Sequence, residues 1–101
     1  MTGEALTPER LRELLRGFLE QHGPEYHLRA LGYFGSYARN EATAESDVDI
    51  VFDTDAPNLF RTAAMWQDLV DLLGRPVDLV RLRGLSNPRL KARVEREAVY
   101  V

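Results

Sequence analysis

Two aspartates separated by one residue, Asp47 and Asp49, are the side chains whose spacing most clearly indicates chemistry. Alternate side chains of an extended strand share a face, so both carboxylates would project together while Val48 and Ile50 point the other way. Like charges so close repel each other, and a divalent cation between them relieves the repulsion. Magnesium is the natural ion, because it takes oxygen ligands and leaves coordination sites for substrate phosphate. The pair predicts a metal site.

A Gly-Ser pair, Gly35 and Ser36, precedes these aspartates. Residues 28–34 (LRALGYF) predict a strand that runs directly into the pair, and the following YARNEA has the composition of a short helix. Backbone N–H groups at a helix start are unpaired and attract phosphate, and glycine lets the phosphate approach closely. Ser36 adds a hydroxyl donor, and Arg39 on the same helical face could reach a phosphate oxygen or brace the carboxylates. The segment predicts a phosphate-binding turn.

Each feature alone has an ordinary structural explanation. A Gly-Ser pair is usually a turn with a helix cap, and an isolated Asp-x-Asp is usually a solvated strand end. Together they are more specific, because strand, Gly-Ser turn, short helix, acidic loop and two-carboxylate strand follow in order within about 25 residues. A site for nucleotide phosphate and metal is the hypothesis that explains the whole segment.

The segment GSYARNEATAESDVDIVFD, residues 35–53, resembles the signature of the nucleotidyltransferase superfamily typified by DNA polymerase beta, and most of all that of the minimal nucleotidyltransferase (MNT) antitoxins. The resemblance implies that the Gly-Ser motif binds a nucleotide triphosphate, that the two aspartates open a metal-binding triad, and that a later strand supplies a third carboxylate. One departure is visible, because Asn40 stands where the family often has glycine. Asparagine tolerates the left-handed conformation better than most residues.

Asp78 is the candidate for the third carboxylate. It lies in the strand-like run RPVDLVRL, where an acidic residue among apolar ones calls for a reason. Taken alone, it is better explained as a half-exposed residue paired with Arg75 or Arg81, whereas its position in the motif order favours metal binding. The predicted catalytic residues and metal ligands are therefore Asp47, Asp49 and Asp78, and the predicted nucleotide-binding residues are Gly35, Ser36 and Arg39.

The resemblance implies nucleotidyl transfer by a two-metal mechanism, with two Mg²⁺ ions and ATP as the donor substrate. It also implies a partner, a HEPN-type ribonuclease toxin that would receive AMP on a tyrosine hydroxyl within a hetero-oligomer. Two alternatives stay open. The chain could be an antitoxin that inhibits by binding alone, or a nucleotidyltransferase for a small molecule that borrows its acceptor pocket from another subunit.

The composition is that of an ordinary globular protein, with 45% hydrophobic and 29% charged residues in 101. This length predicts one minimal nucleotidyltransferase domain over residues 1–101. A net charge of −3 argues against general nucleic-acid binding, and the absence of cysteine excludes disulfides and zinc-thiolate sites. The polar opening MTGEALTPERL lacks the apolar core of a secretion signal, and no apolar run approaches membrane-spanning length, so a cytoplasmic location without membrane contact is expected.

The elements that must position these residues follow an α/β pattern. Helices are expected after the caps Thr7, Asn58 and Asn87, with a short final strand in AVYV. The expected fold is the polymerase beta-like one, a small mixed β-sheet with helices packed chiefly on one side and the metal-binding strands adjacent. On the second helix, the main buried row is expected to be Leu59, Ala63, Trp66, Val70 and Leu73, widened by a second row of Met65, Leu69 and Leu72.

Other polar residues receive no catalytic role. Asp53 is expected to end its strand and shape the next loop, and Asp68 to face water on its helix. His22 has no second ligand at metal-binding spacing. The basic helix near the C-terminus, RLKARVERE, could guide a nucleotide or an acidic partner, but a solvated helix is the more common explanation.

Overall fold

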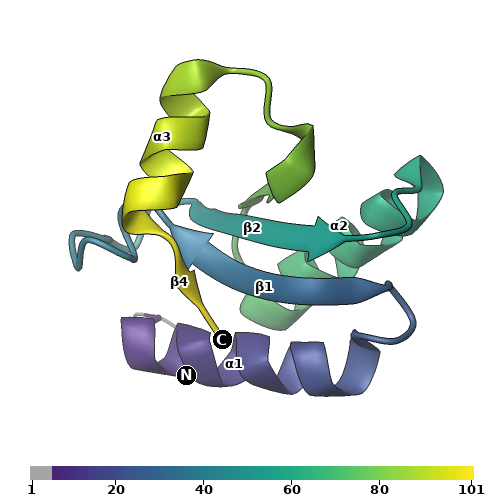
Figure 1. The fold of residues 1–101 in the computed structure, drawn as a ribbon. Coiled ribbons are helices and arrows are strands. Elements are labelled where there is room, and N and C mark those ends of the chain that lie inside the picture. Colours follow the sequence, from purple (N-terminus) through teal and green to yellow (C-terminus); the bar gives the residue numbers. More distant parts are fainter. Residues whose placement is uncertain (1–5) are drawn as a thin grey trace.

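The computed structural model describes residues 6–101; the opening MTGEA, part of the argument against a secretion signal, lies outside the described residues. Within residues 6–101 the chain forms a four-stranded sheet and three α-helices. Figure 1 shows how the helices lie about the sheet. The expected α/β class is confirmed. The elements in chain order are α1 (Pro8–His22), β1 (Leu28–Phe34), β2 (Val48–Thr54), α2 (Leu59–Leu73), β3 (Val77–Arg81), the 3-10 turn η1 (Leu82–Gly84), α3 (Pro88–Glu97) and β4 (Val99–Tyr100).

The sheet is mixed, with strand order β3-β2-β1-β4. β1 pairs antiparallel with β2 and β4, whereas β2 and β3 are parallel. Parallel neighbours need a crossover connection, and α2 supplies it between β2 and β3. The two strands predicted to carry the metal-binding carboxylates are therefore adjacent, as expected.

Two helices cover one face of the sheet and the third lies on the other. α1 and α2 pack with one sheet face around the main core, which includes Leu15, Ile50 and Leu69. α3 lies on the opposite side of the sheet from α1 (Figure 1), and a second, smaller cluster joins its Val94 to Phe34 of β1 and Val51 of β2. The face under α1 and α2 is closed by apolar packing. Side chains available for chemistry therefore lie on the α3 face.

Side-chain caps start the helices where the sequence predicts. The Thr7 hydroxyl accepts from the Arg10 N–H at 3.0 Å, and the Asn58 side-chain oxygen Oδ1 accepts from the Arg61 N–H at 2.9 Å. The Asn87 side chain accepts from two backbone N–H groups at the start of α3. Each cap satisfies donors that the first helical turn leaves without an intrahelical partner.

The buried face of α2 differs from the main row expected. Met65 and Leu69 are fully buried, whereas Leu59 is 87% and Trp66 41% exposed. The Trp66 indole N–H donates to the Val77 carbonyl at 2.8 Å, so this side chain covers the edge strand β3. Among residues 6–101, no strand lies beyond β3 to cover the rest of that row. The core side therefore combines Met65 and Leu69 of the second row with Leu73 of the first, whereas Leu72 of the second row is 40% exposed.

Candidate active site

Strand register brings two of the three predicted carboxylates side by side. Asp49 on β2 is the direct partner of Asp78 on the parallel strand β3. The flanking pairs, Val48 with Val77 and Ile50 with Leu79, belong to the core under α1 and α2. Because side chains alternate across a strand, the two aspartates both face the α3 side. Two stretches about thirty positions apart in the chain thus place acidic oxygens together.

Asp47 lies one residue before β2, and its side chain is exposed. The strand begins at Val48, whose N–H donates to the Pro76 carbonyl at 3.0 Å. The predicted pair is thus an exposed residue at the strand entrance and a half-buried one inside the strand. Their charges still interact, because the negative charge of Asp47 contributes to raising the pKa of Asp49.

Gly35 lies directly against the Asp49 carboxylate. Its φ of +73° falls in the left-handed region that glycine adopts freely. A β-carbon at this position would overlap an Asp49 carboxylate oxygen. Gly35 follows Phe34, which pairs with Asp49 across the β1–β2 ladder. The predicted phosphate-binding turn and the predicted metal site are therefore in contact, and only glycine fits between them.

The segment after Gly35 is a set of turns, so the predicted short helix is wrong. The Arg39 N–H donates to the Gly35 carbonyl at 3.0 Å, and the Glu41 N–H donates to the Ser36 carbonyl at 2.8 Å. Asn40, with a φ of +60°, adopts the left-handed conformation that ends a helical turn. The chain thus makes one turn and leaves it. The Ser36 hydroxyl has no hydrogen-bond partner among residues 6–101 and remains available to a ligand.

Glu97, the last residue of α3, lies against this turn. One of its carboxylate oxygens, Oε1, accepts from the Gly35 N–H at 3.2 Å and from Arg39 Nη1 at 3.0 Å. The Gly35 N–H, expected to face phosphate, is therefore already engaged. Arg39 also donates from Nε to Glu41 at 3.0 Å. Arg39 is thus braced by two glutamates and forms no ion pair with the aspartates.

Arg93 of α3 lies on the same side of the sheet. Its guanidinium carbon is 5.8 Å from the centroid of the Phe34 ring, and its Nε is 3.9 Å from Glu97 Oε1. The sequence prediction missed both Arg93 and Glu97 by treating their helix as solvated. A signal was present, because a carboxylate in the last turn of a helix opposes the helix dipole and needs a compensating partner.

The donor set of the three aspartates fits magnesium, since carboxylate oxygens are the hard ligands that this ion takes. Asp49 and Asp78 are strand partners and Asp47 is one residue away from β2. In the part of the chain that the structure describes, however, no three acidic or imidazole groups are close enough to form a ready metal-binding cluster. Bringing the third carboxylate in would require side-chain rotation, which the exposure of Asp47 and Asp78 permits.

The electrostatics of Asp49 are those of a carboxylate held among like charges. Burial raises the pKa of Asp49 above its ordinary value, and the negative charge of Asp78 raises it further. Arg93 and Arg39 act in the opposite direction and lower the pKa. The net effect is a raised pKa, so the folded protein holds a proton on Asp49 more tightly than the unfolded chain does. An ionised Asp49 therefore costs stability that a bound cation would restore.

We expect Asp49→Asn to stabilise the metal-free protein at neutral pH by on the order of 2–5 °C in melting temperature. A carboxylate with a raised pKa destabilises the fold once ionised, so its penalty is full at neutral pH. The penalty vanishes as pH falls below the raised pKa toward the ordinary value of about 4. The gain from the substitution should shrink over the same window. Thermal unfolding with a chelator from pH 4 to pH 8 measures it, and a variant less stable than wild type at pH 7 would contradict the assignment.

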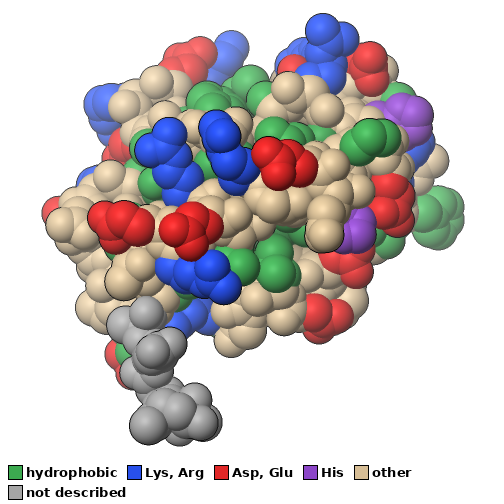
Figure 2. All heavy atoms as spheres, turned by 90° about the horizontal axis from the view of Figure 1, so that it is seen from below, with side chains coloured by type: hydrophobic (Ala, Val, Ile, Leu, Met, Phe, Trp, Pro, Cys, Tyr) green, Lys and Arg blue, Asp and Glu red, His purple; other side chains and the backbone are tan. Residues whose placement is uncertain are grey.

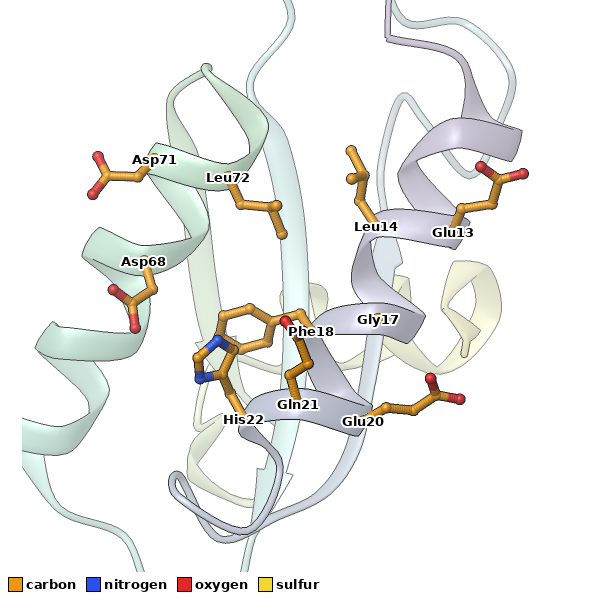
Figure 3. A pocket seen from close by; sticks show the side chains of 10 residues that line it. All are labelled: Glu13, Leu14, Gly17, Phe18, Glu20, Gln21, His22, Asp68, Asp71 and Leu72. Carbon is orange, nitrogen blue, oxygen red and sulfur yellow. The ribbon is translucent and has the colours of Figure 1, made fainter.

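One hollow of the described surface lies elsewhere, between α1 and α2 (Figure 3). Its volume is about 620 Å³, with Leu14 and Leu72 facing each other across it and acidic side chains at its rim. Asp68, expected to face water, accepts instead a hydrogen bond from the Tyr26 hydroxyl beneath this surface. The hollow is on the side of the sheet that α1 and α2 cover, and none of the predicted site residues lines it. It is not part of the candidate active site.

Asp53 does not join the acidic group. Its carboxylate accepts from Arg83 Nε at 2.7 Å and from Arg83 Nη2 at 3.0 Å, a bidentate pair. The Arg83 guanidinium holds the pKa of Asp53 below its ordinary value. The prediction that Asp53 has a structural role agrees with this pairing.

Acidic and basic side chains are interspersed on the α1 face of the molecule, as Figure 2 shows, and they form no continuous basic surface there. Among residues 6–101, no helix combines the length and apolarity needed to cross a membrane.

Comparison with known proteins decides the family. A model of the nucleotidyltransferase domain family matches residues 11–101, nine-tenths of the chain. The chain belongs to this family. The nucleotidyltransferase domain spans the whole described fold from within α1 to the C-terminus, including the Gly-Ser turn and all three aspartates. The expectations of a nucleotidyltransferase enzyme and of the matching fold are confirmed.

Within this family, the chain is similar to MNT proteins. Protein adenylyltransferase MntA of Thermococcus cleftensis is 38% identical over 97 residues, covering 95% of this chain and 97% of that protein. A solved structure provisionally named a minimal nucleotidyltransferase is 35% identical with a TM-score of 0.77, covering 96% and 98% of the two chains. A solved complex of tri-AMPylated Shewanella oneidensis HEPN toxin with MNT antitoxin shares the fold at 23% identity and a TM-score of 0.59, covering 92% and 66%. The likeness to MNT antitoxins is confirmed.

Proposed function

We propose that this nucleotidyltransferase is an antitoxin that transfers AMP from ATP to a tyrosine hydroxyl of a partner HEPN-type toxin. One observation carries the proposal. The carboxylate of Asp49 lies between Gly35 of the phosphate-binding turn and Asp78 on the neighbouring strand. A triphosphate on the turn would thus have its reacting phosphorus beside the acidic oxygens. This contact is what nucleotidyl transfer requires and what a purely structural turn does not need.

The proposed roles follow from position. The Ser36 hydroxyl and the Arg39 guanidinium bind the outer phosphates, since both lie on the turn. Asp47, Asp49 and Asp78 would hold the two Mg²⁺ ions, which when bound supply Lewis-acid stabilisation of the charge that develops on the phosphates. Asp49 is fixed by its strand and by Gly35, so it sets the distance between phosphate and metal. Asp47 and Asp78 are exposed and can adjust.

The proposed step transfers the AMP group of ATP to the acceptor hydroxyl. The acceptor oxygen forms a bond to the α-phosphorus of ATP, and the bond from that phosphorus to the oxygen bridging the β-phosphate breaks. Pyrophosphate leaves, and the Arg39 guanidinium on the turn balances its negative charge. The acceptor proton passes to the Asp78 carboxylate, which is exposed and returns it to water. The product is an adenylylated hydroxyl.

A macromolecular acceptor is supported by the comparisons and by the surface. MntA of Thermococcus cleftensis is a protein adenylyltransferase, and the complex with Shewanella oneidensis HEPN toxin holds an AMPylated toxin. On this chain, Leu59 and Phe60 are 87% and 89% exposed at the start of α2. Leu59 lines a hollow of about 410 Å³ together with Trp66 and Asp78. Exposed apolar side chains beside a site favour protein contact.

The test uses the protein, Mg²⁺, ATP labelled at the α-phosphate, and the product of the adjacent reading frame. We expect the label on the partner, at a tyrosine located by mass spectrometry, together with loss of the partner's ribonuclease activity. Inhibition without label would favour the binding-only antitoxin. Label recovered on a small molecule from a cell extract, with none on the partner, would favour the third alternative. The cytoplasmic location stays a prediction.

We expect Leu59→Ser to raise the KM for the partner toxin about tenfold while leaving ATP binding unchanged. The side chain is exposed and lines the hollow that Asp78 shares, so its loss removes apolar contact with an acceptor but no core packing. Steady-state labelling over a range of partner concentrations measures the effect. Leu72→Ser is the matched control, because Leu72 is a 40% exposed leucine on the same helix that lines the other hollow. An equal loss in both variants would contradict the prediction.

A further inference from the structure

Glu97 is a mostly buried acidic side chain in contact with the phosphate-binding turn. Its side chain is 13% exposed, although it ends a helix whose other charged residues are mostly solvated. α3 is anchored to the sheet by Val94, which is fully buried one turn earlier. Glu97 is therefore a fixed point on a packed helix. A carboxylate so placed at a helix C-terminus opposes the helix dipole, so its partners must stabilise it.

Those partners are the Gly35 N–H at the start of the turn and the Arg39 guanidinium, which is the group that would face a triphosphate. Oε1 of Glu97 accepts from the Gly35 N–H and from Arg39 Nη1, at 3.2 and 3.0 Å. A single oxygen thus ties the start of the turn to a guanidinium four residues later. Charge-assisted hydrogen bonds of this kind hold both geometry and orientation. Without Glu97, the Arg39 side chain would keep only its contact with the exposed Glu41.

Arg39 keeps the capacity to bind phosphate while Glu97 holds it. A guanidinium carries five N–H donors in a fixed fork, and Nε and Nη1 account for the two contacts with Glu41 and Glu97. The remaining donors are the second N–H of Nη1 and both N–H groups of Nη2. The Arg39 side chain is 40% exposed, so these donors are open to a ligand. Holding Nε and Nη1 therefore orients Nη2.

A second guanidinium lies near Glu97, at ion-pair rather than hydrogen-bond distance. Arg93 Nε is 3.9 Å from Glu97 Oε1 one helical turn away, and the Arg93 side chain lies over the Phe34 ring next to Gly35. Arg39 and Arg93, from different elements, thus lie beside Oε1 of this carboxylate on the α3 side of the sheet, and Arg96 Nη2 is 3.9 Å from its Oε2. A lone triphosphate carries more negative charge than one arginine balances, so two are useful where phosphate is bound.

We propose that Glu97 is a positioning residue that fixes the Gly35 turn and the Arg39 guanidinium in the orientation that receives the triphosphate. The inference rests on the proposed function, because it concerns the donor nucleotide of that reaction. Glu97 itself touches no phosphate and acts through Arg39. Its carboxylate stays in place when nucleotide binds, since the Gly35 N–H remains bonded to it and Arg39 has further N–H groups for phosphate.

The experiment measures binding of the nonhydrolysable analogue AMP-PNP with Mn²⁺ to the full chain by calorimetry, without any partner protein. We expect Glu97→Gln to weaken analogue binding about tenfold, because a neutral amide holds a guanidinium less firmly. Glu95→Gln on the exposed face of the same helix is the matched control and should bind like wild type. Tighter binding by Glu97→Gln would overturn the proposal, since it would mean that Glu97 competes with phosphate.

A double-mutant cycle separates positioning from general structural support. If Glu97 acts through Arg39, Arg39→Gln should also weaken binding about tenfold, and the double variant should be no weaker than either single variant. Losses that multiply to about a hundredfold would overturn the proposal. Should Glu97→Gln fail to fold in thermal unfolding, Glu97→Asp is measured instead, and wild-type affinity in that variant would also overturn it.

Failure of this proposal is distinguishable from failure of the proposed function. Wild-type protein that binds the analogue but labels no partner would refute protein adenylylation and leave the role of Glu97 intact. Wild-type protein that binds no analogue would refute both. An unchanged affinity in Glu97→Gln, with normal labelling of the partner by wild type, would refute the role of Glu97 alone.

Discussion

Replacing Asp49 with Asn is expected to lower the rate of AMP transfer to the partner by roughly 10³-fold or more. Asp49 is the strand partner of Asp78 and also contacts Gly35. It therefore holds a position between metal and phosphate that neither of the other two aspartates occupies. A loss of 10³ in rate corresponds to about 4 kcal/mol of transition-state stabilisation. An amide keeps the shape of the side chain but removes the charge that would bind the ions. The measurement is the initial rate of label transfer from α-labelled ATP.

Two features make this prediction sharp. The same substitution is expected to stabilise the metal-free protein at neutral pH, so loss of activity cannot be attributed to unfolding. Asp53→Asn is the matched control, because Asp53 lies on the same strand four residues after Asp49 and is paired with Arg83. It should retain activity within a few-fold and lose some stability instead. Activity retained in Asp49→Asn, or an equal loss in Asp53→Asn, would refute the assigned metal site.

Most of the fold was predictable because local signals and tertiary packing agree. The caps Thr7, Asn58 and Asn87 precede helices in the structure, and the strand predicted at 28–34 is β1 with the same bounds. Sequence periodicity failed on α2, where two apolar rows compete for the core. The choice between them depends on where the sheet ends, and the strand order that places β3 at the edge is not legible in the sequence of one helix.

The sequence predicted the site residues that belong to the family motif, but not those that lie outside the motif and reach the site only in the folded structure. Register pairs Asp49 with Asp78 as the motif order suggested. The helix expected after Ser36 was wrong because composition alone does not show that the turn ends at Asn40. Glu97 was missed because its partners are about sixty positions away in the chain, and its spacing within α3 indicates only a solvated face.

The second large effect is expected at Gly35, where alanine should lower AMP transfer by roughly 10²- to 10³-fold. A methyl group there meets the Asp49 carboxylate, so either the turn or Asp49 must move. Displacement of a reacting group by about 1 Å is enough to cost 10²-fold in rate. The positive φ of Gly35 adds a backbone penalty of about 1–2 kcal/mol for any residue with a β-carbon. Initial rates of labelling and thermal unfolding are measured on the same preparation.

Gly74 provides the control that separates the two causes. It also has a left-handed backbone, with φ of +65°, but a β-carbon added there meets no atom within 4 Å. Gly74→Ala should therefore lose a similar amount of stability from backbone strain and keep transfer activity near that of wild type. If both alanine variants lose activity in proportion to their stability, strain alone accounts for the effect. If only Gly35→Ala loses activity, the close approach of Gly35 to Asp49 is what joins phosphate to metal in this protein.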